Sequence, residues 1–177
     1  MRKKRDAIFL TPRFKELALR YAISLVLFAL TSVGCGLYVH ESGPVQPKKL
    51  PLYERLGADV GITKIVDDFV GIVSTDDRVN FTRKGVPGAE WNASDENVKH
   101  LKEQLVAYIT KAVGGPNKYQ GKSMHDVHRN MQITDGEFDA AIKDLKLALD
   151  RNRIPADAQR ELLEIVEKTE GDIVTKK

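Results

Sequence analysis

The spacing of apolar residues between positions 52 and 174 constrains the fold of this chain most strongly. In four stretches, at 62–73, 98–112, 138–149 and 162–166, apolar side chains recur every three or four residues. This spacing places them on one face of an α-helix, whereas a half-buried strand would alternate with a period of two. No stretch of the domain alternates in that way. The sequence therefore predicts an all-α domain over residues 52–174.

Polar and conformationally special residues indicate where these helices begin and end. Thr134 and Glu137 are spaced as a capping box, in which each side chain satisfies a free backbone amide of the other residue. Ser94 is a suitable cap for the second helix. The run Gly114–Pro116 should end that helix, and Pro155 should precede the last one.

Two segments, 83–97 and 114–133, fit no helical pattern and contain several glycines and prolines. We expect both to be long irregular loops. Long loops in a small domain often enclose a ligand, because binding residues concentrate in loops.

The first 35 residues have the pattern of an export leader. Basic residues at positions 2–5 precede an uncharged run from Tyr21 to Val39, which is long enough to span a bilayer. The only cysteine, Cys35, follows small residues in a sequence that resembles a bacterial lipoprotein box. A cleaved signal peptide, a lipoprotein leader and an uncleaved membrane anchor therefore all remain open for residues 1–35.

A linker over residues 36–51, with glycines and prolines, would join this leader to the domain. Because the basic residues precede the apolar run, the N-terminus should stay inside and the domain should be exported. We expect the protein to be tethered to the membrane on its outer, periplasmic or extracellular, side.

The charge is divided between the two parts of the chain. The first 50 residues hold nine Lys and Arg against three Asp and Glu, and the remaining residues hold 19 against 22. The domain is thus mildly acidic, with charges typical of solvated helix faces. Since it lacks a basic stripe suited to phosphate backbones, we expect no nucleic-acid partner.

Two of the four histidines, His125 and His128, lie three residues apart. This pair is a weak zinc motif because neither a cysteine nor a third ligand lies nearby. The absence of Cys-x-x-Cys-His excludes a covalent c-type haem.

The block that ends at His128 resembles the signature of the truncated haemoglobin family. That signature runs from a double glycine (Gly114-Gly115) through an aromatic residue (Tyr119) and a glycine (Gly121) to a methionine (Met124), and four residues later to the iron-binding histidine. Further segments that match the family are Leu52–Gly57, Val66–Phe69 and Ile133–Phe138. The resemblance covers residues 52–174, and the first group of the family is the most similar.

The resemblance implies a two-on-two helical sandwich around a non-covalently bound haem b (iron protoporphyrin IX). His128 would be the proximal iron ligand, which leaves the sixth position open to oxygen, nitric oxide or carbon monoxide. The resemblance also implies proximal haem contacts from Tyr119, Met124, Val127, Ile133, Phe138 and Leu145, and distal contacts from Val70, Phe81, Leu101, Gln104, Leu105 and Ile109.

Several departures from the family concern the distal side. Val70 stands where the family commonly has a tyrosine, and Leu101 and Leu105 replace the usual glutamine. Gln104 and, less favourably, Tyr108 are the remaining polar candidates. With so few hydrogen-bond donors, a gas ligand should leave quickly, which argues against efficient turnover as a nitric oxide dioxygenase. We therefore expect gas binding or sensing, or electron transfer.

The implied partners are a diatomic gas, an electron-donating reductase and the membrane. The alternative hypothesis is a haem-free helical interaction module on the cell envelope, since its helices would show the same pattern.

One further departure is local: the family has two glycines where this chain has Gly57-Ala58.

Overall fold

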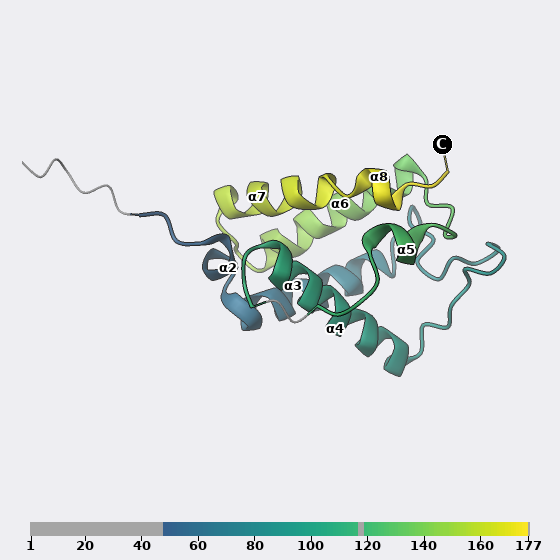
Figure 1. Ribbon diagram of the computed structural model, residues 1–177, viewed down its shortest axis with the longest axis horizontal. Helices are drawn as coiled ribbons and strands as arrows, with labels where there is room; N and C mark the ends of the chain where they lie inside the picture. Colours follow the sequence, from purple (N-terminus) through teal and green to yellow (C-terminus); the bar gives the residue numbers. More distant parts are fainter. Residues whose placement is uncertain (1–47, 117–118, 177) are drawn as a thin grey trace, which may run out of the picture. The chain divides into compact units, whose positions relative to one another are not determined.

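The computed structural model describes residues 48–116 and 119–176, which are helical almost throughout (Figure 1). The helices are α2 (Leu52–Arg55), α3 (Ala58–Val73), α4 (Asp95–Ala112), α5 (Met124–His128), α6 (Asp135–Arg151), α7 (Ala156–Glu167) and α8 (Glu170–Ile173). Within the described residues, extended pairing is limited to an isolated bridge between Thr134 and Lys176. The predicted all-α class is confirmed, while the predicted leader and most of the linker lie outside the described residues.

The four long helices form two packed pairs. Helix α3 packs against α4, α6 packs against α7, and the α3–α6 contact joins the pairs (Figure 1). This arrangement confirms the predicted two-on-two helical sandwich. Short α5 lies beside α8 at the end of the chain.

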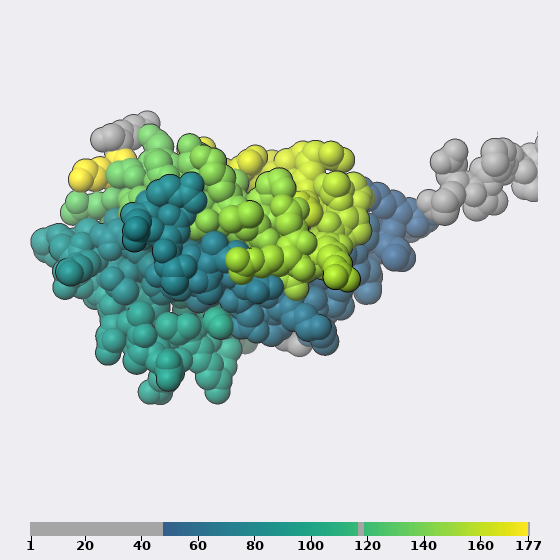
Figure 2. Space-filling model, turned by 180° about the vertical axis from the view of Figure 1, so that it is seen from behind, coloured from purple at the N-terminus to yellow at the C-terminus, as the bar shows by residue number. Residues whose placement is uncertain are grey.

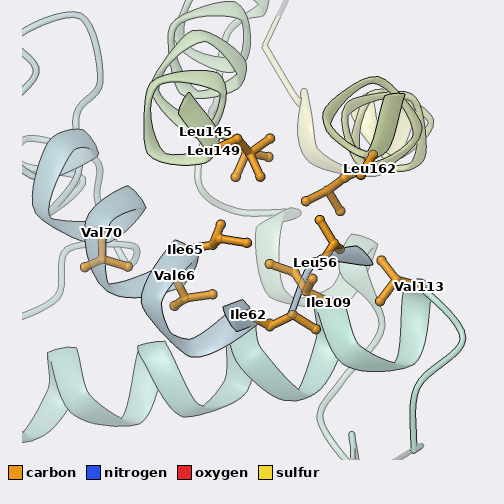
Figure 3. Close-up of a cluster of buried hydrophobic side chains, with 11 residues drawn as sticks. Leu56, Ile62, Ile65, Val66, Val70, Ile109, Val113, Leu145, Leu149 and Leu162 are labelled. Carbon is orange, nitrogen blue, oxygen red and sulfur yellow. The ribbon is translucent and has the colours of Figure 1, made fainter. Parts of the chain in front are cut away.

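An aliphatic cluster fills the space between the pairs (Figure 3). Ile65 of α3 faces Leu145 and Leu149 of α6, while Ile62 of α3 lies beside Ile109 of α4. Leu162 enters from α7, and Val70 lies further along α3. The apolar periodicity of the sequence thus predicts the faces that are buried, because hydrophobic burial is the main force that joins amphipathic helices.

The helix boundaries follow the predicted signals. Ser94 accepts a hydrogen bond from the Asn97 amide at the start of α4, and Thr134 and Glu137 form both hydrogen bonds of the capping box. Helix α4 ends two residues before Gly114, which has a left-handed φ of 84°. The prediction for residues 114–133 is wrong in one respect: a five-residue helix, α5, lies within the expected loop.

The turn before α3 shows the conformational cost of the local departure from the family. Gly57 has a φ of 85°, and Ala58 follows with a φ of 53°, a left-handed conformation that is unfavourable for a residue with a side chain. Gly61, one turn later, is needed for a different reason: a Cβ atom there would lie 2.0 Å from the carbonyl oxygen of Leu56.

Residues 74–94 connect α3 to α4 without a helix. In Figure 2 the dark-teal segment after α3 lies against the green start of α6. Two ion pairs hold it there: Arg83 with Glu137 at 2.6 Å, and Arg78 with Asp144 at 3.6 Å. In the described part of the chain, no helix is both long enough and apolar enough to cross a bilayer.

Candidate haem site

His128 is the last residue of α5, where a local hydrogen bond sets the orientation of its ring. Helix α5 is capped by Ser123, whose hydroxyl accepts a hydrogen bond from the Asp126 amide. One turn later, the Nδ1 atom of His128 lies 2.8 Å from the carbonyl oxygen of Met124. A carbonyl can only accept, so Nδ1 carries the proton and Nε2 is left with a free electron pair. Nε2 has no hydrogen-bond partner among the described residues.

The surroundings of His128 favour its neutral form. Burial lowers the pKa of the half-buried imidazole, and the contact with the Met124 carbonyl offsets this only in part. The ring is therefore uncharged at neutral pH. A neutral imidazole whose other nitrogen donates to a carbonyl is the usual arrangement of a metal-binding histidine.

The segment before α5 is held by tyrosine rings. The Tyr119 hydroxyl donates to the Lys122 carbonyl oxygen at 2.7 Å, and a Cβ atom on Gly121 would lie 2.5 Å from the Tyr119 ring. This contact explains why an aromatic residue and a glycine occur together in the motif. The Tyr108 ring meets Tyr119 edge-on, with 5.4 Å between centroids. Because Tyr108 packs against this segment, Gln104 is the favoured polar candidate on the distal side.

A second glycine explains the close approach of the α4 end to the start of the domain. A Cβ atom on Gly115 would lie 2.6 Å from the Tyr53 ring and 2.8 Å from the Thr110 methyl group. The two glycines of the motif therefore have different roles, since Gly114 supplies the left-handed turn and Gly115 supplies the space.

The predicted distal residues fall into two groups. Val70 and Ile109 are buried in the aliphatic cluster, and Phe81 and Leu105 pack against it. Leu101 and Gln104 lie half-buried on α4, outside that cluster. The structure thus brings Val70, Phe81, Leu105 and Ile109 together, and their contact with a haem stays a prediction.

The predicted proximal residues range from buried to exposed. Phe138 and Leu145 are buried on α6, and Leu145 belongs to the aliphatic cluster. Met124 and Ile133 are half-buried, whereas Val127 is 37% exposed. Large apolar side chains that are only half covered, such as those of Met124 and Ile133, are compatible with a flat, largely apolar cofactor.

Two features of the site were not anticipated from the sequence. Trp91 packs on Phe81, with 5.3 Å between ring centroids, and its Nε1 donates to the Phe81 carbonyl oxygen at 2.8 Å. The chain end also braces the segment after α5, because the amides of Thr175 and Lys176 both donate to the Ile133 carbonyl oxygen at 3.0 Å. A lone tryptophan and two backbone amides near the chain end give no periodic signal in the sequence.

The prominent hollows of the described surface lie away from His128. A groove of about 460 Å³ runs between α3 and α4, and an open depression of about 600 Å³ follows the segment after α3. His128 lines neither of them. Among the described residues there is also no cluster of three or more His, Cys, Asp or Glu that could hold a metal ion. A single imidazole beside apolar side chains fits haem iron, whose remaining in-plane ligands come from the porphyrin.

Comparison with known proteins agrees with this geometry. The model of the bacterial-like globin family matches residues 51–175. This chain belongs to that family. The Group 1 truncated hemoglobin of Tetrahymena thermophila is 29% identical over 129 residues, which are 73% of this chain and 98% of that protein.

One further relative supports the assignment to the first group, and a solved structure supports the fold. The Group 1 truncated hemoglobin GlbN of Synechocystis is 33% identical over 110 residues, which are 60% of this chain and 81% of that protein. The crystal structure of the 2/2 hemoglobin of a Synechococcus species, in the cyanomet state and with covalently attached heme, is 28% identical. It covers 72% of this chain and 100% of its own, with a TM-score of 0.61.

Membership in the family confirms the central predictions from the sequence. The protein is a truncated haemoglobin of the first group, its cofactor is haem, and it binds a diatomic gas. The comparisons lend no support to the alternative of a haem-free interaction module.

Proposed function

We propose that His128 is the proximal iron ligand of this globin. The open Nε2 atom carries the proposal, because the hydrogen bond from Nδ1 to the Met124 carbonyl points the other nitrogen away from its own helix. When bound, haem supplies an iron whose sixth position accepts the gas. Met124 keeps the ring oriented, and burial keeps it uncharged, so that Nε2 carries no proton.

Titration of the haem-free protein with haemin, followed by absorption, tests this assignment. The His128→Ala variant should lose the spectrum of an axially coordinated haem. His125→Ala is the matched control, because His125 lies on the same short helix but is exposed, with Nδ1 3.9 Å from an Asp126 carboxylate oxygen. An unchanged spectrum in His128→Ala, with loss in His125→Ala, would transfer the role to His125.

We propose further that the distal side is apolar. Val70 is buried on α3 and offers no donor, and Leu101 and Leu105 of α4 offer none. Gln104, half-buried on α4, is the favoured polar candidate. Such a pocket favours rapid gas release, so the function is gas binding or sensing, or electron transfer with a reductase, rather than efficient nitric oxide dioxygenation.

The proposed location is the outer side of a membrane, with the leader of residues 1–35 as the tether. The basic residues and the uncharged run support this proposal. Cell fractionation of the full chain should find it with membranes. Loss of membrane association in Cys35→Ser would indicate a lipidated cysteine, and unchanged association would indicate an anchor that is not cleaved. Recovery of the intact full chain from the cytosol would contradict the tether.

A further inference from the structure

The segment between α3 and α4 contains an arginine that is almost entirely buried. Arg83 is 6% exposed, although it lies in a connection and not in a helix. Burying a guanidinium is costly unless its donors are paired. Here Nη1 lies 2.6 Å from Glu137 Oε1, and Nη2 donates to the Gln132 carbonyl oxygen at 3.3 Å. The burial of this charge therefore calls for a local explanation.

Glu137, the partner of Arg83, joins three segments through one carboxylate. Its Oε2 accepts from the Thr134 amide at 3.0 Å, which closes the capping box of α6. Its Oε1 accepts from the Asn80 amide at 3.2 Å. Burial raises the pKa of Glu137, but the hydrogen bonds from Arg83, Thr134 and Asn80 together outweigh this effect, so that the pKa is lowered. The carboxylate is thus ionised at neutral pH and pairs with the guanidinium.

The other branch of Arg83 reaches the stretch between His128 and α6. Within that stretch the Met131 amide donates to the His128 carbonyl oxygen at 2.8 Å, which turns the chain out of α5. Gln132 follows with a φ of 52°, a left-handed conformation that a residue with a side chain rarely adopts without restraint. Arg83 donates to the carbonyl of that same strained residue.

We propose that Arg83 is a positioning residue for the proximal histidine, a role that rests on the function proposed for His128. Its guanidinium group joins two parts of the chain. One is the segment that carries Phe81, on the proposed distal side, and the other is the backbone of Gln132, four residues after His128. This fixes the turn out of α5 and with it the direction of the imidazole. Arg83 lies two residues after Phe81, so one side chain links both sides of the haem site.

The geometry requires arginine rather than lysine. A planar guanidinium can donate to a carboxylate and to a carbonyl at once, whereas a lysine ammonium at the end of a flexible stem cannot span both in fixed directions. Arg83→Lys should therefore keep the charge pair with Glu137 and lose the contact with Gln132. Arg83→Met should lose both. Arg78→Met is the matched control, because Arg78 is an exposed arginine of the same segment that pairs with Asp76.

Hydrogen–deuterium exchange of the haem-free protein provides the first test. The amides of residues 129–134 should exchange about tenfold faster in Arg83→Lys and Arg83→Met, because a charge-assisted hydrogen bond is lost. They should be unchanged in Arg78→Met. If Arg83→Met does not fold, Arg83→Lys decides the test. Wild-type exchange of these amides in Arg83→Lys would overturn the proposal.

Resonance Raman spectroscopy of the ferrous, ligand-free, haem-loaded protein provides the second test. The iron–histidine stretching band should shift or broaden in Arg83→Lys and keep its wild-type form in Arg78→Met. A lower unfolding temperature with an unmoved band would show a merely structural role and would overturn the proposal. If the role proposed for His128 is itself wrong, the band will persist in His128→Ala. That outcome does not depend on the result at Arg83, so the two failures can be distinguished.

Discussion

At the scale of single residues, Val70 has the greatest consequence for gas binding. It is 3% exposed and lies on the α3 face that packs against α4 and α6. The family commonly has a tyrosine at this position, so this chain has an isopropyl group in place of a hydrogen-bond donor. A hydrogen bond to a ligand in a site of low dielectric is worth about 1–2 kcal/mol.

We predict that Val70→Tyr slows oxygen dissociation by about tenfold, the factor that corresponds to one such hydrogen bond. Stopped-flow displacement of oxygen by carbon monoxide measures the rate. Val70→Phe is the control, because it adds a ring of nearly the same size without the hydroxyl. Equal slowing by tyrosine and phenylalanine would show that bulk, and not hydrogen bonding, controls release.

Ala58 is a second residue where this chain departs from its family, and the cost is conformational. Its left-handed φ of 53° is unfavourable for alanine by about 1 kcal/mol or more, and glycine would avoid this cost. We predict that Ala58→Gly stabilises the domain by about 1 kcal/mol in urea unfolding. Ala107→Gly, inside α4, is the control and should destabilise by a similar amount. Loss of stability in both variants would refute the strain at Ala58.

At the scale of helices, a carboxyl pair lies where the segment after α3 packs against α6. Asp144 of α6 is 1% exposed and lies beside Asp76, while Arg78 lies 3.6 Å away. Burial raises the pKa of Asp144, and the neighbouring Asp76 raises it further. Arg78 instead lowers the pKa of Asp76 to about 2. The two carboxyl groups therefore hold one proton between them over a range of acidic pH.

This pair predicts an unusual pH dependence for Asp144. Because its pKa is higher in the folded state than in the unfolded state, its contribution to stability falls as pH rises from about 4 through the folded pKa. An asparagine side chain at this position would stay neutral, so Asp144→Asn should gain stability relative to the wild type over that range. Urea unfolding at several pH values measures the difference.

The control for that prediction is Asp150→Asn, for which the sign is opposite. Hydrogen bonds from Lys146 and Gln159 lower the pKa of Asp150, so its carboxylate stabilises the fold above about pH 4. The Asp150→Asn variant should therefore lose stability relative to the wild type as pH rises. A wild type that gains stability over Asp144→Asn with rising pH would contradict the raised pKa.

The helices also show how far the sequence alone could predict the fold. Helices α3, α4, α6 and α7 have 12 to 18 residues each, long enough for their apolar period and caps to identify them. Helices α5 and α8 have five and four residues, which is too short for a period to show. They pack against each other, although they are distant in sequence, and the Thr175 and Lys176 amides just after α8 donate to the Ile133 carbonyl oxygen.

The candidate site divides in the same way. His128 and the glycines before it form a continuous motif, and the local hydrogen bonds of Met124 and Tyr119 agree with that motif. Arg83 was not anticipated, because Glu137 is 54 residues away and a charged residue in a polar connection looks solvated. Such contacts between connections follow from the packing of the whole domain and leave no local pattern.

At the scale of the whole molecule, the haem and the fold support each other. Half-covered apolar side chains around His128 should be protected when the cofactor binds, which links haem affinity to stability. In the proposed site, one coordination bond, from His128 to iron, would hold the cofactor in this domain, and the proposed roles of Met124 and Arg83 depend on it.

Resonance Raman spectroscopy of the ferrous, ligand-free protein observes this bond itself. We predict an iron–histidine stretching band in the wild type that is absent in His128→Gly and returns when imidazole is added to fill the cavity. A band that persists unchanged in His128→Gly without imidazole would contradict the assignment of His128, because another residue would then hold the iron.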